Sequence, residues 1–257
     1  MNGHGNWVAF KTIVGREVRR ILRIWGQTLV PPTITMTLYF VIFGKMVGGR
    51  IGTMDGLPYI DFIVPGLIMM SVIQNSYGNI VSSFFGAKFQ RFIEEMLVTP
   101  TPNWVILSGY VIGALLRGLM VGGMVLLVAM CFTEIRVAHP LITLVTLLLT
   151  ALVFAFAGFI NAMFAKKFDD IAIIPTFVLT PLTYLGGVFY SVSLLPPVWK
   201  TISHFNPILY MVNAFRYGLL GISDVGIGTA LTLMTGFAVL LGGGSLLLLQ
   251  RGTGLRQ

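Results

Sequence analysis

The side chains that could carry out chemistry in this chain are few and widely separated. His4, His139 and His204 are too far apart to supply the HExxH pattern of a zinc site. The single cysteine, Cys131, lies in an apolar run, which excludes a disulfide framework and a cysteine metal site. The GxxxxGK(S/T) loop that cradles nucleotide phosphates and the GxSxG turn of serine hydrolases are both absent. We therefore expect no catalytic residue and no metal ligand.

The remaining ionisable groups argue against an energy source within the chain. Asp169 and Asp170 form a carboxylate pair that could bind a metal, but the neighbouring Lys166 and Lys167 favour a solvated turn. Arg117 is the firm candidate for a charge inside a membrane span, either paired with carbonyl groups or reaching toward an interface. Carriers driven by an ion gradient usually embed carboxylates in their spans, and this sequence does not. Energy for any work must then come from another protein.

Composition assigns these groups to a helical membrane protein. Of the 257 residues, 56% are hydrophobic and 10% are charged, and the mean hydropathy is +0.88. Soluble domains carry about 25% charged residues. Apolar runs of the roughly 20 residues needed to span a bilayer recur along the chain, whereas the alternation of a transmembrane barrel does not. We expect an all-α polytopic protein with a single membrane domain over 1–257 and no cleavable signal peptide.

The apolar runs predict six spans behind a basic helix at 7–25. One face of that helix is apolar (Trp7, Phe10, Val14, Val18, Ile21, Trp25) and the other is basic (Lys11, Arg16, Arg19, Arg20, Arg23). Such a helix is typical of an anchor in the membrane plane rather than a nucleic-acid arm. The expected spans are 26–47, 61–84, 104–132, 141–164, 171–190 and 228–249. Pro31-Pro32 should kink or break the first span. Residues 191–221 contain two apolar pieces suited to re-entrant segments.

The distribution of cations predicts the orientation. Six spans place both termini on one side, and the positive-inside rule assigns that side to the cytoplasm. The cytoplasmic side then holds the five cations of the first helix with Lys88, Arg91, Lys166, Lys167, Arg251 and Arg256, and the other side holds Lys45, Arg50, Arg136 and Lys200. Arg216 lies in a re-entrant piece.

The segment 85–98 between the second and third spans predicts a short amphipathic cytoplasmic helix. Phe85, Phe89, Phe92, Ile93 and Met96 recur at helical spacing opposite Lys88, Arg91, Glu94 and Glu95. Gln90 and Glu94, and Arg91 and Glu95, stand four apart. Thr99-Pro100-Thr101-Pro102 then ends the helix. The helix could receive force from a separate motor protein or rest on lipid headgroups, and its cytoplasmic placement favours the motor contact.

Three longer stretches resemble the ABC type-2 (ABC-2) exporter permeases. They are GAKFQRFIEEMLVTPTP (86–102), PTFVLTPLTYLGGVFYSVSLLPP (175–197) and NPILYMVNAFRYGLLG (206–221). The last is similar to the family's C-terminal signature, with Asn206, Pro207, Tyr210, Arg216 and Gly221 in the expected order. The similarity covers essentially the whole chain. It is greatest to small bacterial drug-, polysaccharide- and Nod-factor-export permeases that are encoded apart from their ATPase.

The resemblance implies a homodimer in the bacterial inner membrane, with both termini cytoplasmic. Two copies of an ABC ATPase would hold ATP and Mg, and this chain would carry no cofactor. The segment 86–98 would be the coupling helix, contacting the ATPase through Phe89, Gln90, Arg91, Phe92, Glu94, Glu95 and Met96. The pieces within 191–221 would cap the outer leaflet. The exported compound would be an amphiphile: drug-like, lipid or glycan.

The resemblance also implies a substrate pathway along the second and fifth spans. Their polar and aromatic residues are Gln74, Asn75, Tyr77, Asn79, Thr180 and Tyr184. These side chains could line the pathway or form hydrogen bonds between helices. Two alternatives to an exporter are an ion-coupled secondary transporter and an intramembrane lipid-modifying enzyme. An enzyme of that kind would need Asp, Glu or His clustered at one depth, and a purely structural scaffold would not need spans interrupted by glycine and proline.

Overall fold

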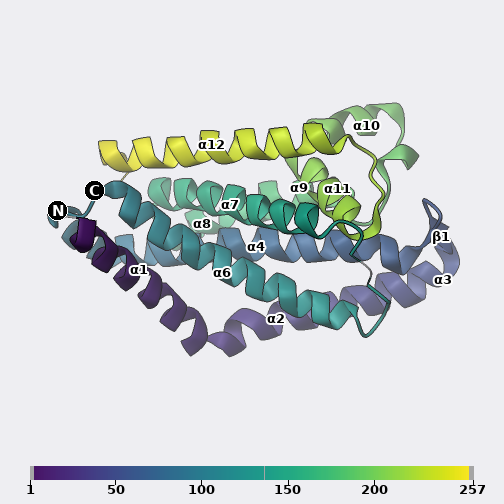
Figure 1. Cartoon of the computed structure of the whole chain (residues 1–257), viewed down its shortest axis with the longest axis horizontal. Helices are drawn as coiled ribbons and strands as arrows, with labels where there is room; N and C mark the ends of the chain where they lie inside the picture. The colour runs from purple at the N-terminus through teal and green to yellow at the C-terminus, as the bar shows by residue number, and fades with distance from the viewer. Residues whose placement is uncertain (1–2, 136, 255–257) are drawn as a thin grey trace.

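The computed structural model describes residues 3–135 and 137–254. Its long helices lie side by side, with both ends of the described chain at the same end of the bundle (Figure 1). We call this the termini end. A two-stranded antiparallel hairpin of β1 (Thr53–Met54) and β2 (Leu57–Pro58) lies at the opposite end, which we call the hairpin end. Arg136 and Arg256, two of the cations used to predict the orientation, lie outside the described residues.

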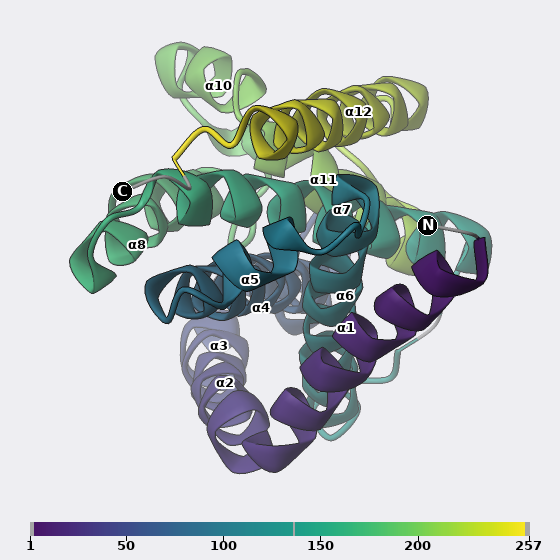
Figure 2. The ribbon, with the colours of Figure 1, turned by 90° about the vertical axis from the view of Figure 1, so that its left-hand side faces the viewer.

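The N-terminal helix and the first span meet at a sharp corner. Helix α1 (Gly3–Arg23) crosses the termini end, and α2 (Trp25–Tyr39) turns back along the bundle (Figure 2). Helix α2 continues through Pro31 and Pro32, so the span is not broken there, and a kink at this pair stays a prediction. The irregular part comes later, as a π-helical stretch at Phe40–Val47 that leads into α3 (Gly48–Ile51).

Helix α4 (Tyr59–Phe89) forms the core of the bundle, and most of its side chains are buried. It packs mainly against α6 (Asn103–Ala129) and α7 (Pro140–Phe164). Small residues let these helices approach closely. At Gly158 of α7, an added Cβ would lie 2.8 Å from the backbone oxygen of Tyr77, so a larger residue there would push the helices apart.

The fifth expected span is not one continuous α-helix. It consists of α8 (Phe168–Ile174), a π-helical turn at Pro175–Leu179 and α9 (Thr180–Tyr184). Proline explains the interruption, since it supplies no backbone donor to the preceding turn. The hydroxyl of Thr180 donates a hydrogen bond to the backbone oxygen of Pro175 at 2.9 Å and so satisfies a carbonyl in the irregular turn.

The last part of the chain returns to the hairpin end and then crosses the bundle once more. A 3₁₀ turn (Val192–Leu194) precedes α10 (Pro197–His204) and α11 (Pro207–Leu220), and α12 (Ile227–Arg251) runs back to the termini end (Figure 1). Both short helices are below the length of a span, as the re-entrant prediction requires.

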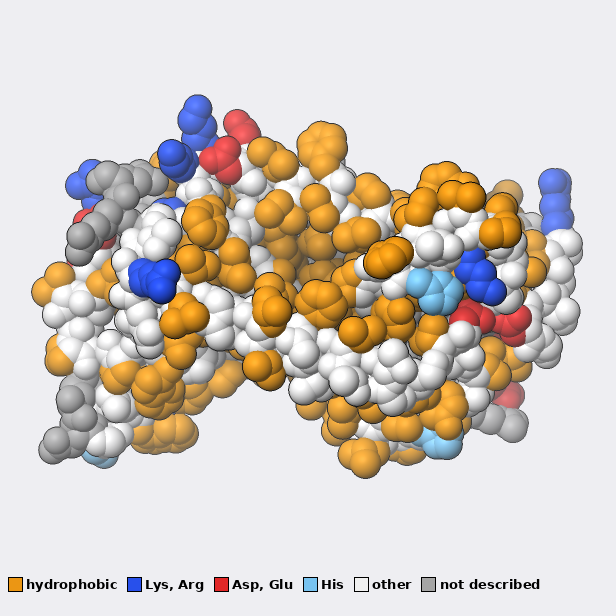
Figure 3. Space-filling view, turned by 90° about the horizontal axis from the view of Figure 1, so that it is seen from above, with side chains coloured by type: hydrophobic (Ala, Val, Ile, Leu, Met, Phe, Trp, Pro, Cys, Tyr) orange, Lys and Arg blue, Asp and Glu red, His pale blue; other side chains and the backbone are white. Residues whose placement is uncertain are grey.

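Four stretches of the described chain are long and apolar enough to cross a membrane. They are Trp25–Ile51, Asn103–Ala129, Pro140–Phe164 and Ile227–Arg251. Apolar side chains cover the middle of the face seen in Figure 3, while charged side chains gather toward its two ends. This arrangement matches a bilayer core between two aqueous layers. The predicted all-α polytopic membrane fold is confirmed at this level.

Candidate functional site

The segment 85–98 differs from the single helix that its spacing predicts. Helix α4 continues to Phe89, the chain turns at Gln90 and Arg91, and α5 (Phe92–Val98) follows. Arg91 adopts the left-handed conformation, with φ of 61°. Because the helix breaks there, the spacings from Gln90 to Glu94 and from Arg91 to Glu95 do not place these side chains on one continuous helix face.

The turn and α5 lie at the termini end (Figure 2). Their exposed side chains are both polar and aromatic. We call residues 89–96 the coupling tip. Phe89 is 61% exposed and Phe92 is 47% exposed, whereas Ile93 is 2% exposed and anchors α5 to the bundle. Of the seven predicted contact residues, Met96 is half-buried and the others are exposed: Phe89, Gln90, Arg91, Phe92, Glu94 and Glu95.

Contacts to α7 and α8 fix the base of the coupling tip. The ammonium group of Lys88 donates hydrogen bonds to the backbone oxygens of Met163 at 2.6 Å and Ala165 at 2.8 Å. These carbonyls lie at the end of α7, where a cation also compensates the helix dipole. The ring of Phe89 packs against that of Phe168 with 5.0 Å between centroids. The tip is therefore attached to the corner between two other helices.

The carboxylate pair beside this corner forms a helix start. One carboxylate oxygen of Asp170 accepts hydrogen bonds from the backbone amides of Lys166 at 2.8 Å and Lys167 at 2.9 Å. These two hydrogen bonds hold the pKa of Asp170 below its ordinary value. Within the described residues, His, Cys, Asp and Glu form no cluster of three or more that could hold a metal.

The six predicted pathway residues include exposed, half-buried and buried side chains. Gln74 is exposed, while Tyr77 is buried. Asn75 is buried, and its side chain donates to the backbone oxygen of Ser71 within α4 at 3.0 Å. Asn79 is fully buried, and Thr180 is bound to the turn at Pro175.

The sixth pathway residue, Tyr184, belongs to an aromatic group at the hairpin half of the bundle. Its hydroxyl lies 3.2 Å from that of Tyr39 on α2. Both rings lie 5.8 Å from the ring of Phe189, and the tilted ring of Phe43 packs against Phe189 at 4.7 Å between centroids. Tyr184 is also partly exposed. This group is thus an amphipathic surface formed by the first and fifth expected spans.

The residues of the C-terminal signature hold α11 at both ends. Asn206 caps its start, because the side-chain oxygen accepts from the amide of Ile208 at 3.0 Å while its amide group donates to the backbone oxygen of Leu182 at 2.6 Å. Pro207 occupies the first helical position, where proline is favoured. Gly221 ends the helix with φ of 76°, a left-handed conformation that suits glycine. Tyr210 donates to the backbone oxygen of His204 at 2.9 Å.

Arg216, the remaining signature residue, is buried among three elements. Its guanidinium donates to the backbone oxygen of Gly187 at 2.6 Å. The guanidinium carbon lies 3.9 Å from the ring centroid of Phe62 on α4, a cation–π contact. The signature therefore forms a joint between α4, α11 and the turn after α9.

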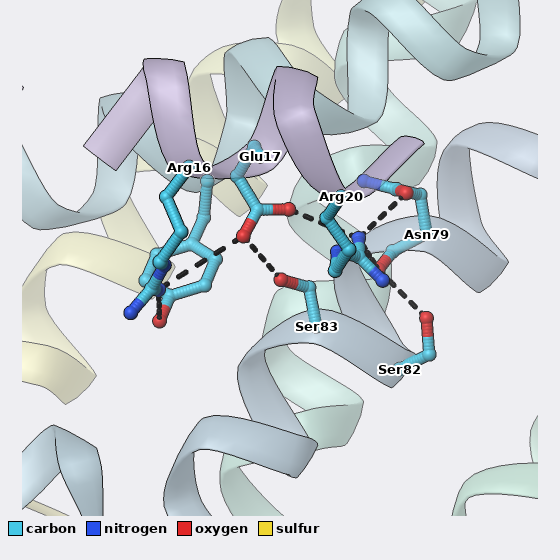
Figure 4. Close-up of polar contacts among 7 residues, drawn as sticks. Arg16, Glu17, Arg20, Asn79, Ser82 and Ser83 are labelled. Atoms are coloured by element: carbon cyan, nitrogen blue, oxygen red, sulfur yellow. Dashed lines mark hydrogen bonds and ion pairs between the residues drawn. The ribbon is translucent and has the colours of Figure 1, made fainter. Parts of the chain in front are cut away.

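Sequence reasoning missed a polar network between α1, α4 and α6 (Figure 4). Glu17 is 1% exposed, and its carboxylate accepts from Arg20 at 2.9 Å and from Ser83 at 2.6 Å. Arg20 also donates to the side chain of Asn79 at 2.8 Å, and Arg16 donates to the hydroxyl of Tyr110. We call these residues the Glu17 network. One signal was available in the sequence: Glu17 stands four residues from Ile13 and from Ile21, the other buried residues of α1.

Comparison with known proteins agrees with these features. Residues 8–220 match the family described as ABC-2 type transporter. The inner membrane transport permease YadH of Escherichia coli is 57% identical over 253 residues, which cover 98% of this chain and 99% of YadH. Nodulation protein J of Sinorhizobium fredii is 27% identical over 238 residues, 91% of this chain and 89% of that protein. Nodulation protein J of Rhizobium leguminosarum bv. trifolii is 25% identical over 222 residues, 85% and 83% respectively.

The family match covers most of the chain, and the similarity to YadH extends over nearly all of it. Together with the four membrane-crossing stretches, this places the chain in the inner membrane as a multi-pass protein. It also confirms the resemblance seen in the sequence, and a permease of this kind implies an ATPase partner subunit. The chain belongs to the ABC-2 type transporter family and is the non-catalytic transmembrane permease subunit of an ABC transporter.

Proposed function

We propose that the chain is one half of a homodimeric ATP-driven exporter for an amphiphilic compound. Two copies of a separate ABC ATPase would bind at the termini end, which faces the cytoplasm, and would hold ATP and Mg. The permease itself needs no cofactor in this scheme, because nucleotide binding and hydrolysis belong to the partner. Export requires a pathway through the bilayer and a contact surface through which the ATPase can change the conformation of the permease.

Six spans follow if two further units are added to the four apolar stretches. Helix α4 is long enough to cross the membrane, but its polar residues between Gln74 and Asn79 lower its hydropathy. Asn75, Tyr77 and Asn79 are buried by other helices, so their polar atoms do not face lipid, while Gln74 is exposed on the outside of this single subunit. The unit α8–α9, the fifth expected span, provides the other crossing. Its irregular turn is of the kind tolerated in a membrane where the backbone polar groups form hydrogen bonds within the protein.

The exposure of the coupling tip is the observation that carries this proposal. Phe89 and Phe92 are large apolar side chains held in an exposed position beside Glu94 and Glu95. A solvent-exposed surface of this mixed character is typical of a protein–protein contact, in which aromatic anchors are surrounded by charges. The base of the tip is fixed by Lys88 to the end of α7. Movement of a bound ATPase would therefore be passed to several spans together.

The first experiment tests the ATPase contact. Glu94→Arg combined with Glu95→Arg reverses the charge of the coupling tip, and we expect the co-expressed ATPase to be lost from the permease during affinity purification in detergent. Asp169→Arg is the matched control, since Asp169 is an exposed carboxylate outside the tip at the start of α8. Retention of the ATPase by the double variant at the wild-type ratio would refute the assignment.

The second candidate occupant of the tip, a lipid headgroup layer, predicts a different result. In that case charge reversal would leave the ATPase ratio unchanged and would instead alter the amount of anionic lipid that copurifies with the permease. Vanadate-sensitive ATP hydrolysis of the purified complex in lipid measures whether the assembly is a working transporter.

A further inference from the structure

A basic cavity lies where α1 crosses the end of α4 and the coupling tip. Its volume is about 650 Å³. Four arginines of α1 line it, Arg16, Arg19, Arg20 and Arg23, and the opposite wall includes Ser82, Gln90 and Phe92. Consecutive turns of one helix thus place cations along one recess, in which Arg20 is half-buried while Arg16, Arg19 and Arg23 are exposed. We call this recess the basic cavity.

The charge in the basic cavity is largely uncompensated. Glu17 is the one acidic residue in its lining, and both of its carboxylate oxygens already accept hydrogen bonds, from Arg20 and Ser83. Arg19 and Arg23 form no ion pair within residues 3–135 and 137–254. Four arginines thus share this recess with one carboxylate, and an anion bound there would reduce the repulsion among them.

The guanidinium donors that line the cavity are only partly used. Arg20 donates to Glu17 and to Asn79. Within the described chain, Arg19 and Arg23 are exposed and form no side-chain hydrogen bond. Guanidinium groups match the oxygens of a phosphate in a bidentate geometry, so phosphate suits these donors better than a halide or a small carboxylate.

The surroundings of the cavity favour a lipid as the source of the phosphate. On the same helix, Leu22 is 55% exposed, and Trp25 at the following corner is 60% exposed. Apolar side chains of this kind enter the acyl layer when a basic amphipathic helix lies in the membrane plane. Ile24 and Phe92 add apolar surface within the cavity itself. A phosphate on an acyl chain would therefore find both kinds of contact.

We propose that the basic cavity is a binding site for the phosphate-bearing headgroup of an anionic membrane lipid. Arg19 and Arg23 contact the phosphate, and Glu17 holds Arg20 in position as a further donor. The bound lipid connects α1 to the coupling tip, because Gln90 and Phe92 form the opposite wall. This site is independent of the compound that the transporter exports.

The test measures lipid retention by the purified permease with its ATPase partner. The full chain is equilibrated in mixed micelles containing equal amounts of dioleoyl phosphatidic acid and dioleoyl phosphatidylcholine, and retained lipids are counted by native mass spectrometry. We expect the wild type to retain phosphatidic acid preferentially. Arg19→Gln with Arg23→Gln should reduce that preference by about fivefold or more, since two cations at the site are removed.

Two further variants separate a specific site from general charge. Lys11→Gln with Arg251→Gln removes two exposed cations near the same end that do not line the cavity, and it should retain the wild-type preference. Arg19→Lys with Arg23→Lys keeps the charge and should recover part of the binding. Equal loss in the cavity variant and in the Lys11 variant would overturn the proposal, and so would no loss in either.

Competition with inorganic phosphate shows whether the bound phosphate belongs to a lipid, and ATPase retention shows whether the cavity contacts a protein instead. Millimolar inorganic phosphate should leave lipid retention largely intact, because it lacks the acyl contacts. If inorganic phosphate binds with the same dependence on Arg19 and Arg23 while the lipid does not, the lipid assignment is refuted. If the cavity variant loses the ATPase but keeps its lipid, the cavity is a protein contact instead. Elution as a single folded species in size-exclusion chromatography is required of each variant.

Discussion

Buried polar residues give the bundle its specific geometry at the level of single side chains. The Glu17 network joins the interfacial helix to α4 through Arg20, Ser83 and Asn79. Arg216 makes a corresponding joint near the hairpin end through Phe62 and the Gly187 carbonyl. A buried charge is costly unless it is paired or hydrogen-bonded, so each partner in these contacts is needed once the others are present.

Removing the carboxylate of Glu17 should destabilise the protein. Glu17→Ala leaves Arg20 and Ser83 without their shared acceptor. A buried donor left unsatisfied lowers the folding stability by about 1–3 kcal/mol. We expect a lower apparent Tm in detergent, measured by a fluorescence thermal shift. Glu94→Ala is the control, because Glu94 is an exposed carboxylate at the same end. Equal Tm values for the two variants would show that the Glu17 network does not stabilise the fold.

Substitutions in the expected pathway should distinguish a lining from a packing role. Tyr184 is partly exposed within an aromatic group, so Tyr184→Ala should reduce the transport of amphiphiles and leave the Tm nearly unchanged. Asn75 is buried and bonded within α4, so Asn75→Leu should act mainly on stability. The measurement is uptake of a panel of fluorescent amphiphiles into inverted proteoliposomes with the ATPase present. Unchanged uptake by Tyr184→Ala would assign that residue to packing.

At the level of elements, the apolar runs located the long helices within a few residues. The expected spans 104–132, 141–164 and 228–249 correspond to α6, α7 and α12, because uninterrupted apolar residues allow little else in a bilayer. The shape of the segment 85–98 is harder to predict from the sequence. Just before its break at Arg91, Lys88 donates to acceptors at the end of α7 that are 75 and 77 positions away in the sequence. Local spacing carries no information on such a partner.

The same limit applies to the other irregular elements. Prolines indicated a disturbance in the fifth span, and the π-helical turn at Pro175–Leu179 is found there. Pro31 and Pro32 gave a similar signal, yet α2 is continuous and the irregular stretch follows at Phe40–Val47. In contrast, Glu17 was recoverable from the four-residue spacing of α1. The site could therefore be predicted as a location, and its hydrogen bonds could not.

The left-handed turn at Arg91 should be essential for the position of α5. Proline cannot adopt a positive φ, so Arg91→Pro should displace α5 and abolish ATPase association while the spans still insert. Arg91→Gly tolerates the conformation, so it should retain more of the ATPase than Arg91→Pro although it also removes a predicted contact side chain. Co-purification with the ATPase from detergent extracts provides the measurement. If both variants retain it equally, the turn is not required for the contact.

At the level of the whole molecule, orientation is the feature on which the other proposals depend. Single cysteines can report it after Cys131→Ser removes the native thiol. Glu95→Cys at the coupling tip should react with a membrane-impermeant maleimide only in inverted vesicles, and Lys200→Cys on α10 only in spheroplasts. Both positions are exposed, so access depends on the side of the membrane. The reverse labelling pattern would invalidate the cytoplasmic placement of the tip.

The continuity of α4 has a mechanical consequence for such an assembly. Its 31 residues extend about 46 Å at 1.5 Å per residue, from the turn beside the hairpin to Phe89 at the coupling tip. Near one end of α4, Phe62 makes the cation–π contact with Arg216. Near the other end, Lys88 donates a hydrogen bond to the end of α7. A stiff lever of that length, tilted by about 5°, shifts its far end by about 4 Å. In the proposed transporter, a small displacement of the coupling tip by the ATPase would therefore move the hairpin end of α4 by a similar distance.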